Sequence, residues 1–109
     1  MELNEISKEA YENSKAHGFW KKERDFGEII ALIHTEVSEA FEEYRNGKTY
    51  TEIYYENENK PCGIPSELAD IIIRIGDFCG AYGIDLDKIV EEKMKYNKTR
   101  EYKHNGKKC

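Results

Sequence analysis

Two acidic pairs are the residues of this chain best suited to chemistry: Glu36-x-x-Glu39 and Glu67-x-x-Asp70. Residues three apart lie on the same face of a helix, so each pair directs two carboxylates the same way. Two such helices packed together would gather four carboxylates, which is unfavourable unless cations neutralise them. Ligation by anionic oxygens alone suits Mg²⁺, with Mn²⁺ as an alternative. The spacing therefore predicts a divalent-metal site.

The apolar residues around the pairs place these carboxylates at the edge of a buried surface. In the helix predicted for residues 25–45, Glu36 falls inside the apolar arc and Glu39 lies at its edge. In the next helix, Glu67 and Asp70 flank the apolar arc. Either motif alone is typical of a solvated helix face, and Asp70 with Arg74 has the spacing of a simple ion pair. A carboxylate within an apolar arc is costly without a partner, however, and this favours metal ligation.

A basic stripe follows on the last predicted helix. The apolar residues Leu86, Ile89 and Val90 begin a face that helical steps continue to three polar positions: Lys93, Asn97 and Arg100. Lys gives a compact charge and Arg a bidentate fork, so the stripe predicts an anion site, with phosphate the best match. The alternative is an ordinary surface Lys and an Arg that complements the helix dipole. Spacing alone leaves both interpretations open.

Trp20 joins an aromatic surface to positive charge, because Phe19 precedes it and Lys21, Lys22 and Arg24 follow. Such a loop could stack on a nucleobase and approach phosphates, which makes Trp20 a candidate substrate contact. A core anchor or an oligomer contact is an equally good interpretation.

Helical signals dominate the chain. We predict helices over residues 3–16, 25–45, 65–82 and 85–100, with Pro65 at the first helical position and Gly83 as a C-terminal cap. For residues 48–64 we favour a loop, although the stretch TYTEIYY has the composition of a short strand. The expected fold class is all-α, with a four-helix core in one domain spanning residues 1–109. Ala69, Ile73 and Gly76 form a second small or apolar face on the third helix, which predicts a homo-oligomer.

Composition limits the classes of partner. A net charge of -5 argues against a nucleic-acid binder, which would show a basic face. Three cysteines without a CxxC pair argue against a disulfide framework or a zinc site. No run of about 18 apolar residues is present and no leader pattern opens the chain, so we expect a cytoplasmic protein without a membrane partner. The polar segment 101–109 is expected to be a mobile end or a flap over a phosphate.

The order of these motifs resembles the MazG-like, all-α nucleoside triphosphate pyrophosphohydrolases. The matching stretches are LIHTEVSEAFEEYRNG, then ELADIIIRIGDFCGAYGIDLDKIVEEKMKYNKTR, then EYKHNGK, within residues 20–107. The resemblance implies that Glu36, Glu39, Glu67 and Asp70 bind Mg²⁺ and that the basic stripe contacts the triphosphate. It also implies a helical bundle assembled as a homodimer or homotetramer, with sites near subunit interfaces.

The expected reaction of such a protein converts an NTP or dNTP and water to a nucleoside monophosphate and pyrophosphate. Glu39 is the candidate general base, and Lys93 and Arg100 would stabilise the leaving pyrophosphate. Two alternatives stay open at this point. One is a related enzyme that cleaves phosphoribosyl-ATP, and the other is a non-catalytic helical module that binds a nucleotide or a protein. The motifs do not identify a base or a sugar.

Overall fold

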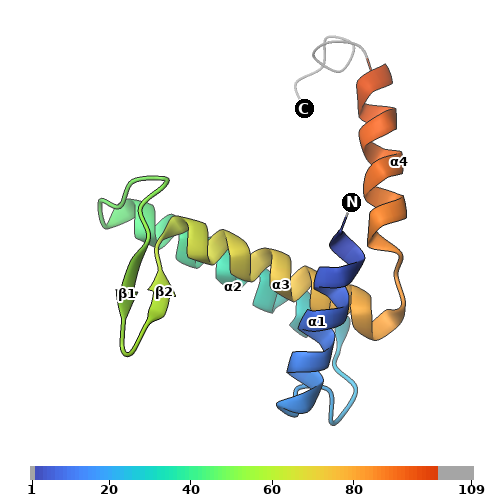
Figure 1. Ribbon diagram of the computed structural model, residues 1–109, viewed down its shortest axis with the longest axis horizontal. Coiled ribbons are helices and arrows are strands. Elements are labelled where there is room, and N and C mark those ends of the chain that lie inside the picture. The colour runs from blue at the N-terminus through green and yellow to red at the C-terminus, as the bar shows by residue number, and fades with distance from the viewer. Residues whose placement is uncertain (1, 101–109) are drawn as a thin grey trace.

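The computed structural model describes residues 2–100, which form helices and one small hairpin (Figure 1). The elements, in chain order, are α1 (Leu3–Ala16), α2 (Phe26–Arg45), β1 (Tyr54–Glu56), β2 (Lys60–Cys62), α3 (Ile64–Tyr82) and α4 (Leu86–Thr99). The predicted helices are confirmed, with ends within about one residue of those expected. Segment 101–109, predicted to be a mobile end or a flap, lies outside the described residues.

Side chains at the helix ends explain these boundaries. Asp25 caps α2 by accepting a hydrogen bond of 2.9 Å from the Gly27 amide. Glu28 in the first turn of α2 pairs with Arg24 at 2.7 Å. Helix α3 begins one residue before Pro65, which still lies in the first turn. Gly83 ends α3 in the left-handed conformation, with φ 66°, as predicted.

The loop predicted for residues 48–64 is wrong in part, because it contains an antiparallel hairpin. Tyr54 pairs with Cys62 and Glu56 pairs with Lys60. Three consecutive residues with positive φ, 57–59, make the turn. Two of these three are asparagines, which tolerate this conformation better than most residues, and tyrosines favour the extended strand before it. The Asn-rich and Tyr-rich composition was therefore a hairpin signal.

Helix α3 is the centre of the fold, with α2 packed along it and α1 crossing it. The crossing of α1 needs glycine, because a Cβ at Gly80 would lie 2.6 Å from the Ser7 carbonyl oxygen. Gly76 faces the same turn of α1, and the Ser7 side chain is buried there. Helix α1 thus covers part of the small-residue face that the sequence left for a partner subunit. Ile73 and Ala69, one and two turns before Gly76, remain exposed.

Helix α4 is attached to α1 by a reciprocal pair of caps. The Asn4 side-chain oxygen accepts a hydrogen bond of 2.9 Å from the Leu86 amide at the start of α4. In return, Asp87 accepts a bond of 2.9 Å from the Leu3 amide at the start of α1. Beyond this joint α4 points away from α2 and α3, and none of its described residues is buried (Figure 1). The four helices therefore do not close into the predicted core within one chain.

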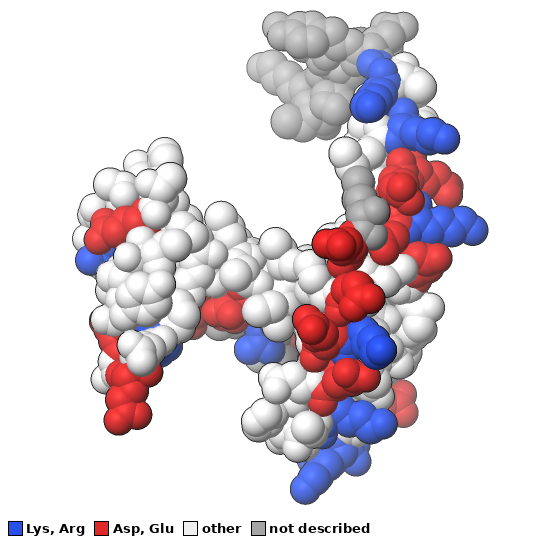
Figure 2. Space-filling model, viewed as in Figure 1, with Lys and Arg blue, Asp and Glu red and all other residues white. Residues whose placement is uncertain are grey.

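A broad apolar surface on α2 and α3 remains uncovered. Over residues 2–100 the only buried apolar side chains are those of Ile29, Cys62 and Cys79. By contrast, Phe41 of α2 is 60% exposed and Ile72 of α3 is 51% exposed. Figure 2 shows that the surface over the middle of α2 and α3 has few charged side chains, whereas α1 and α4 have many. None of the helices in the described part of the chain has the length and apolar character needed to cross a membrane.

Candidate metal centre

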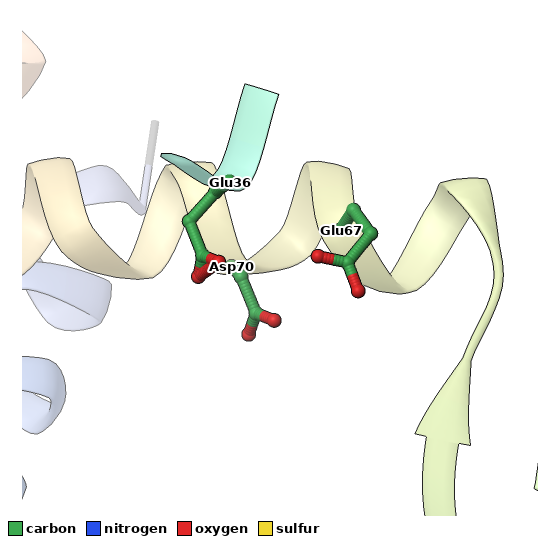
Figure 3. A group of neighbouring side chains, drawn as sticks. All are labelled: Glu36, Glu67 and Asp70. Carbon is green, nitrogen blue, oxygen red and sulfur yellow. The ribbon is translucent and has the colours of Figure 1, made fainter. Parts of the chain in front are cut away.

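Three of the four predicted carboxylates meet between α2 and α3. One carboxylate oxygen from each of Glu36, Glu67 and Asp70 lies within 4.8 Å of the others. Figure 3 shows these carboxylates on the same side of α3, with Glu67 nearest the hairpin. Glu36 comes from the middle of α2, and the other two are one helical turn apart on α3. The two helices that bring carboxylates together are therefore the two predicted from the spacing of the acidic pairs.

Burial makes this cluster electrostatically costly. Glu36 is 8% exposed, and one oxygen of Glu67, Oε2, is buried without a hydrogen-bond partner. Burial, followed by a hydrogen bond with Glu39 and the negative charges nearby, raises the pKa of Glu67 to about 7. Burial also raises the pKa of Glu36, helped by Glu39 and Asp70. Glu67 therefore partly retains its proton near neutral pH, where a carboxylate in water would be ionised.

Glu39 lies at the rim of the cluster. Its side chain is exposed, and it does not belong to the group of three residues whose carboxylate oxygens lie within 4.8 Å of one another. It is nevertheless close enough to raise the pKa of both Glu36 and Glu67 through a hydrogen bond. Glu39 is thus the most exposed of the four carboxylates and the one best placed to contact a water molecule from solvent.

The donor set fits a hard divalent cation. With each ligand about 2.1 Å from Mg²⁺, adjacent ligand oxygens are roughly 3.0 Å apart and opposite ones roughly 4.2 Å. Three oxygens within 4.8 Å of one another would therefore have to move closer together to share one ion. The Glu67 oxygen without a donor would gain a partner, and the mutual repulsion that raises the pKa values of Glu36 and Glu67 would be relieved.

Arg74 contacts this cluster from outside. Its Nε donates to Glu36 Oε2 at 3.4 Å, and its positive charge opposes the rise in the pKa of Glu36. The sequence suggested that Arg74 pairs with Asp70 along α3, but the recorded ion pair joins α3 to α2 instead. The partner that a buried Glu36 requires is thus Arg74, which could not be deduced before the two helices were aligned.

The basic stripe does not reach this cluster within one chain. Lys93, Asn97 and Arg100 are all exposed on the outer half of α4, which points away from the α2–α3 pair (Figure 1). Lys93 Nζ lies 5.7 Å from the centre of the Tyr96 ring, and the Arg100 guanidinium carbon lies 5.9 Å from it. The expectation that the stripe holds an anion at one end of a closed core is therefore not met by a single chain.

Trp20 has the contacts of an anchor. Its indole N–H donates to Asp77 Oδ1 at 2.8 Å and lies 2.9 Å from Ser14 Oγ, which itself donates to Asp77 at 2.6 Å. The rings of Phe19 and Tyr82 meet it edge-on. Trp20 thus ties the connection between α1 and α2 to α3, while stacking on a base stays a prediction.

A further polar contact links the hairpin to α2. The Tyr54 hydroxyl lies 2.7 Å and 2.9 Å from the two carboxylate oxygens of Glu43, and this hydrogen bond raises the pKa of Tyr54 to about 12. Glu43 is one turn beyond Glu39 on α2. This contact was not predicted from the sequence, where the available signal was the position of Glu43 on the acidic edge of the helix.

Comparison of the chain with family models, with curated proteins and with solved structures finds no match.

Proposed function

We propose that this protein is a Mg²⁺-dependent nucleoside triphosphate pyrophosphohydrolase. It would convert an NTP or dNTP and water to a nucleoside monophosphate and pyrophosphate, as the sequence resemblance implies. The observation that carries the proposal is the convergence of Glu36, Glu67 and Asp70, with a buried Glu67 oxygen that lacks a donor. A buried carboxylate oxygen without a partner, such as Glu67 Oε2, is costly, and a divalent cation is a partner that suits three converging carboxylates.

Glu36, Glu67 and Asp70 would hold Mg²⁺, with Mn²⁺ as a substitute. When bound, the ion would supply positive charge to the phosphates and make the attacking water more acidic. Glu39 would either complete the ligand set or orient this water and accept its proton. The second role suits its exposure at the rim of the cluster, because a base must reach solvent to release the proton that it takes.

Phosphate contacts would come from Lys93, Asn97 and Arg100. The two cations would stabilise charge on the departing pyrophosphate, and the amide would orient the phosphates or the sugar. Because α4 points away from the carboxylates of its own chain, we assign these contacts to α4 of a second copy. The same second copy would cover the exposed apolar surface of α2 and α3 in a homodimer or homotetramer.

The first experiment incubates the protein with a panel of NTPs, dNTPs and phosphoribosyl-ATP in Mg²⁺, and measures pyrophosphate and monophosphate. Glu36→Gln and Asp70→Asn should abolish turnover while leaving helical content intact. Glu42→Gln is a matched control, since Glu42 is an exposed residue of α2 whose ion pair is with exposed Arg45. Full activity in both cluster variants would refute the assignment. Cleavage of phosphoribosyl-ATP alone would favour the related enzyme. Absence of cleavage with every substrate would favour the non-catalytic binding module.

The second experiment tests the assignment of α4 to another subunit. Inactive Glu36→Gln chains are unfolded together with inactive Lys93→Ala chains, refolded, and assayed. In a dimer with shared sites, half of the dimers are mixed, and each mixed dimer has one intact site, so about a quarter of wild-type activity returns. If each site is built from one chain, every site in the mixture has a defect and no activity returns.

A further inference from the structure

Arg74 occupies a position that the reaction described above leaves without a role. It belongs to α3 and reaches across to α2, where Nε donates to Glu36 Oε2 at 3.4 Å. The side chain of Glu36 is 11% exposed and that of Arg74 is 37% exposed. The arginine therefore lies on the solvent side of a carboxylate that is itself largely enclosed.

One side of the Arg74 side chain faces a packed wall. Together with Asp77, Trp20 and Phe78 it lines a cavity of only about 10 Å³, roughly the space of one water molecule. Asp77 and Trp20 are joined by a hydrogen bond of 2.8 Å, so this wall connects the loop after α1 to α3. On this side, therefore, little free space is left beside Arg74, while its Nε contacts Glu36.

A carboxylate has two oxygens, and a donor on one of them sets the direction of the other. Arg74 contacts Oε2 of Glu36, and one oxygen of Glu36 lies within 4.8 Å of oxygens of Glu67 and Asp70. A donor that holds Oε2 would direct the other oxygen toward a cation shared by the three carboxylates. Groups that hydrogen-bond to metal ligands in this way typically account for 10- to 100-fold in metal affinity.

We propose that Arg74 is a positioning residue that orients Glu36 for divalent-cation binding. This role rests on the proposed function, because it requires the carboxylate cluster to bind a metal. It differs from simple charge compensation, since a nearby positive charge that did nothing else would repel a cation and weaken its binding.

The test is the affinity for Mn²⁺ without nucleotide, measured by electron paramagnetic resonance of the free ion. Arg74→Met removes the donor and should weaken Mn²⁺ binding about 10-fold or more. Arg74→Lys keeps the charge but loses the planar fork, and its affinity should fall between those of Arg74→Met and wild type. Arg45→Met is the control, because it removes an exposed ion pair with Glu42 on the same bundle, and it should change affinity less than about twofold.

Equal or tighter binding by Arg74→Met would overturn the proposal, because it would reduce Arg74 to charge compensation. If Arg74→Met does not fold, Arg74→Lys decides alone: weaker binding than wild type supports a positioning role, and equal binding overturns it. Absence of Mn²⁺ binding by wild type, or unchanged binding by Glu36→Gln, would instead overturn the proposed metal site and the Arg74 role with it. Failure of the inference alone is thus distinguishable from failure of the function.

Discussion

Replacing Glu67 with glutamine should stabilise the metal-free protein at alkaline pH. The pKa of Glu67 rises from an ordinary value of 4.5 to about 7 in the folded chain, mainly through burial. Between these two values the folded state holds a proton that the unfolded state has lost. The free energy of unfolding therefore falls as pH rises through this window and stays low above it.

The size of the effect follows from the width of that window. A shift from 4.5 to about 7 corresponds to at most about 3 kcal/mol at pH 8. Glu67 is only partly enclosed, so solvent screening should reduce this to roughly 1–2 kcal/mol. Glutamine has the same shape, carries no charge, and can donate a hydrogen bond to Glu39. Glu67→Gln should therefore be more stable than wild type by about 1–2 kcal/mol at pH 8 and nearly equal to it at pH 5.

Urea unfolding followed by circular dichroism in EDTA, at pH 5 and pH 8, measures this difference directly. Adding Mg²⁺ at pH 8 should stabilise wild type but not the variant, since binding to the folded state alone shifts the unfolding equilibrium. Glu42→Gln on α2 is the control and should change stability by less than about 0.5 kcal/mol at either pH. A Glu67→Gln protein that is less stable than wild type at pH 8, or that keeps the wild-type pH dependence, would refute the electrostatic reasoning.

Three further outcomes follow from the packing. Asn4→Ala removes the side-chain cap on the Leu86 amide and should lower the free energy of unfolding in urea by about 1 kcal/mol. An unchanged urea midpoint would mean that this contact between α1 and α4 does not contribute to stability. Gly80→Ala places a methyl group 2.6 Å from the Ser7 carbonyl oxygen and should cost about 2–3 kcal/mol, whereas Ala69→Ser on the exposed face of α3 should be nearly neutral by the same measurement. Ile72→Glu puts a charge on the exposed apolar surface and should convert the proposed oligomer to single chains, as measured by light scattering after size exclusion. Lys8→Glu on α1 should leave the mass unchanged, and an Ile72→Glu protein of wild-type mass would exclude this surface as the contact.

The sequence predicted the helices and the acidic edge of each buried face because both depend on local periodicity. The apolar arc around Glu36 belongs to one helix, and its burial at 8% exposure agrees with the position deduced from that arc. Gly83 and Asp85 mark helix ends through their own backbone and side-chain preferences, so they too could be interpreted in isolation.

What the sequence did not predict depends on how elements meet. Arg74 has an acidic neighbour on its own helix and another on α2, and only the register between the helices selects Glu36. The close crossing of α1 over Gly80 likewise needs both helices, so the covering of the small-residue face by α1 was not foreseen. The direction of α4 depends on the joint between Asn4 and Asp87, whose residues are more than 80 positions apart. Helical periodicity contains no information about such an angle.

The chain has a single tryptophan, and its indole is bonded to Asp77 of α3 from the loop that follows α1. Its fluorescence emission is therefore an intrinsic optical reporter of that one junction, without any label. Detachment of α1 from α3 would expose the ring to water and shift the emission to the red, even while the helices themselves persisted. Tryptophan fluorescence can thus distinguish detachment of α1 from unfolding of the whole chain.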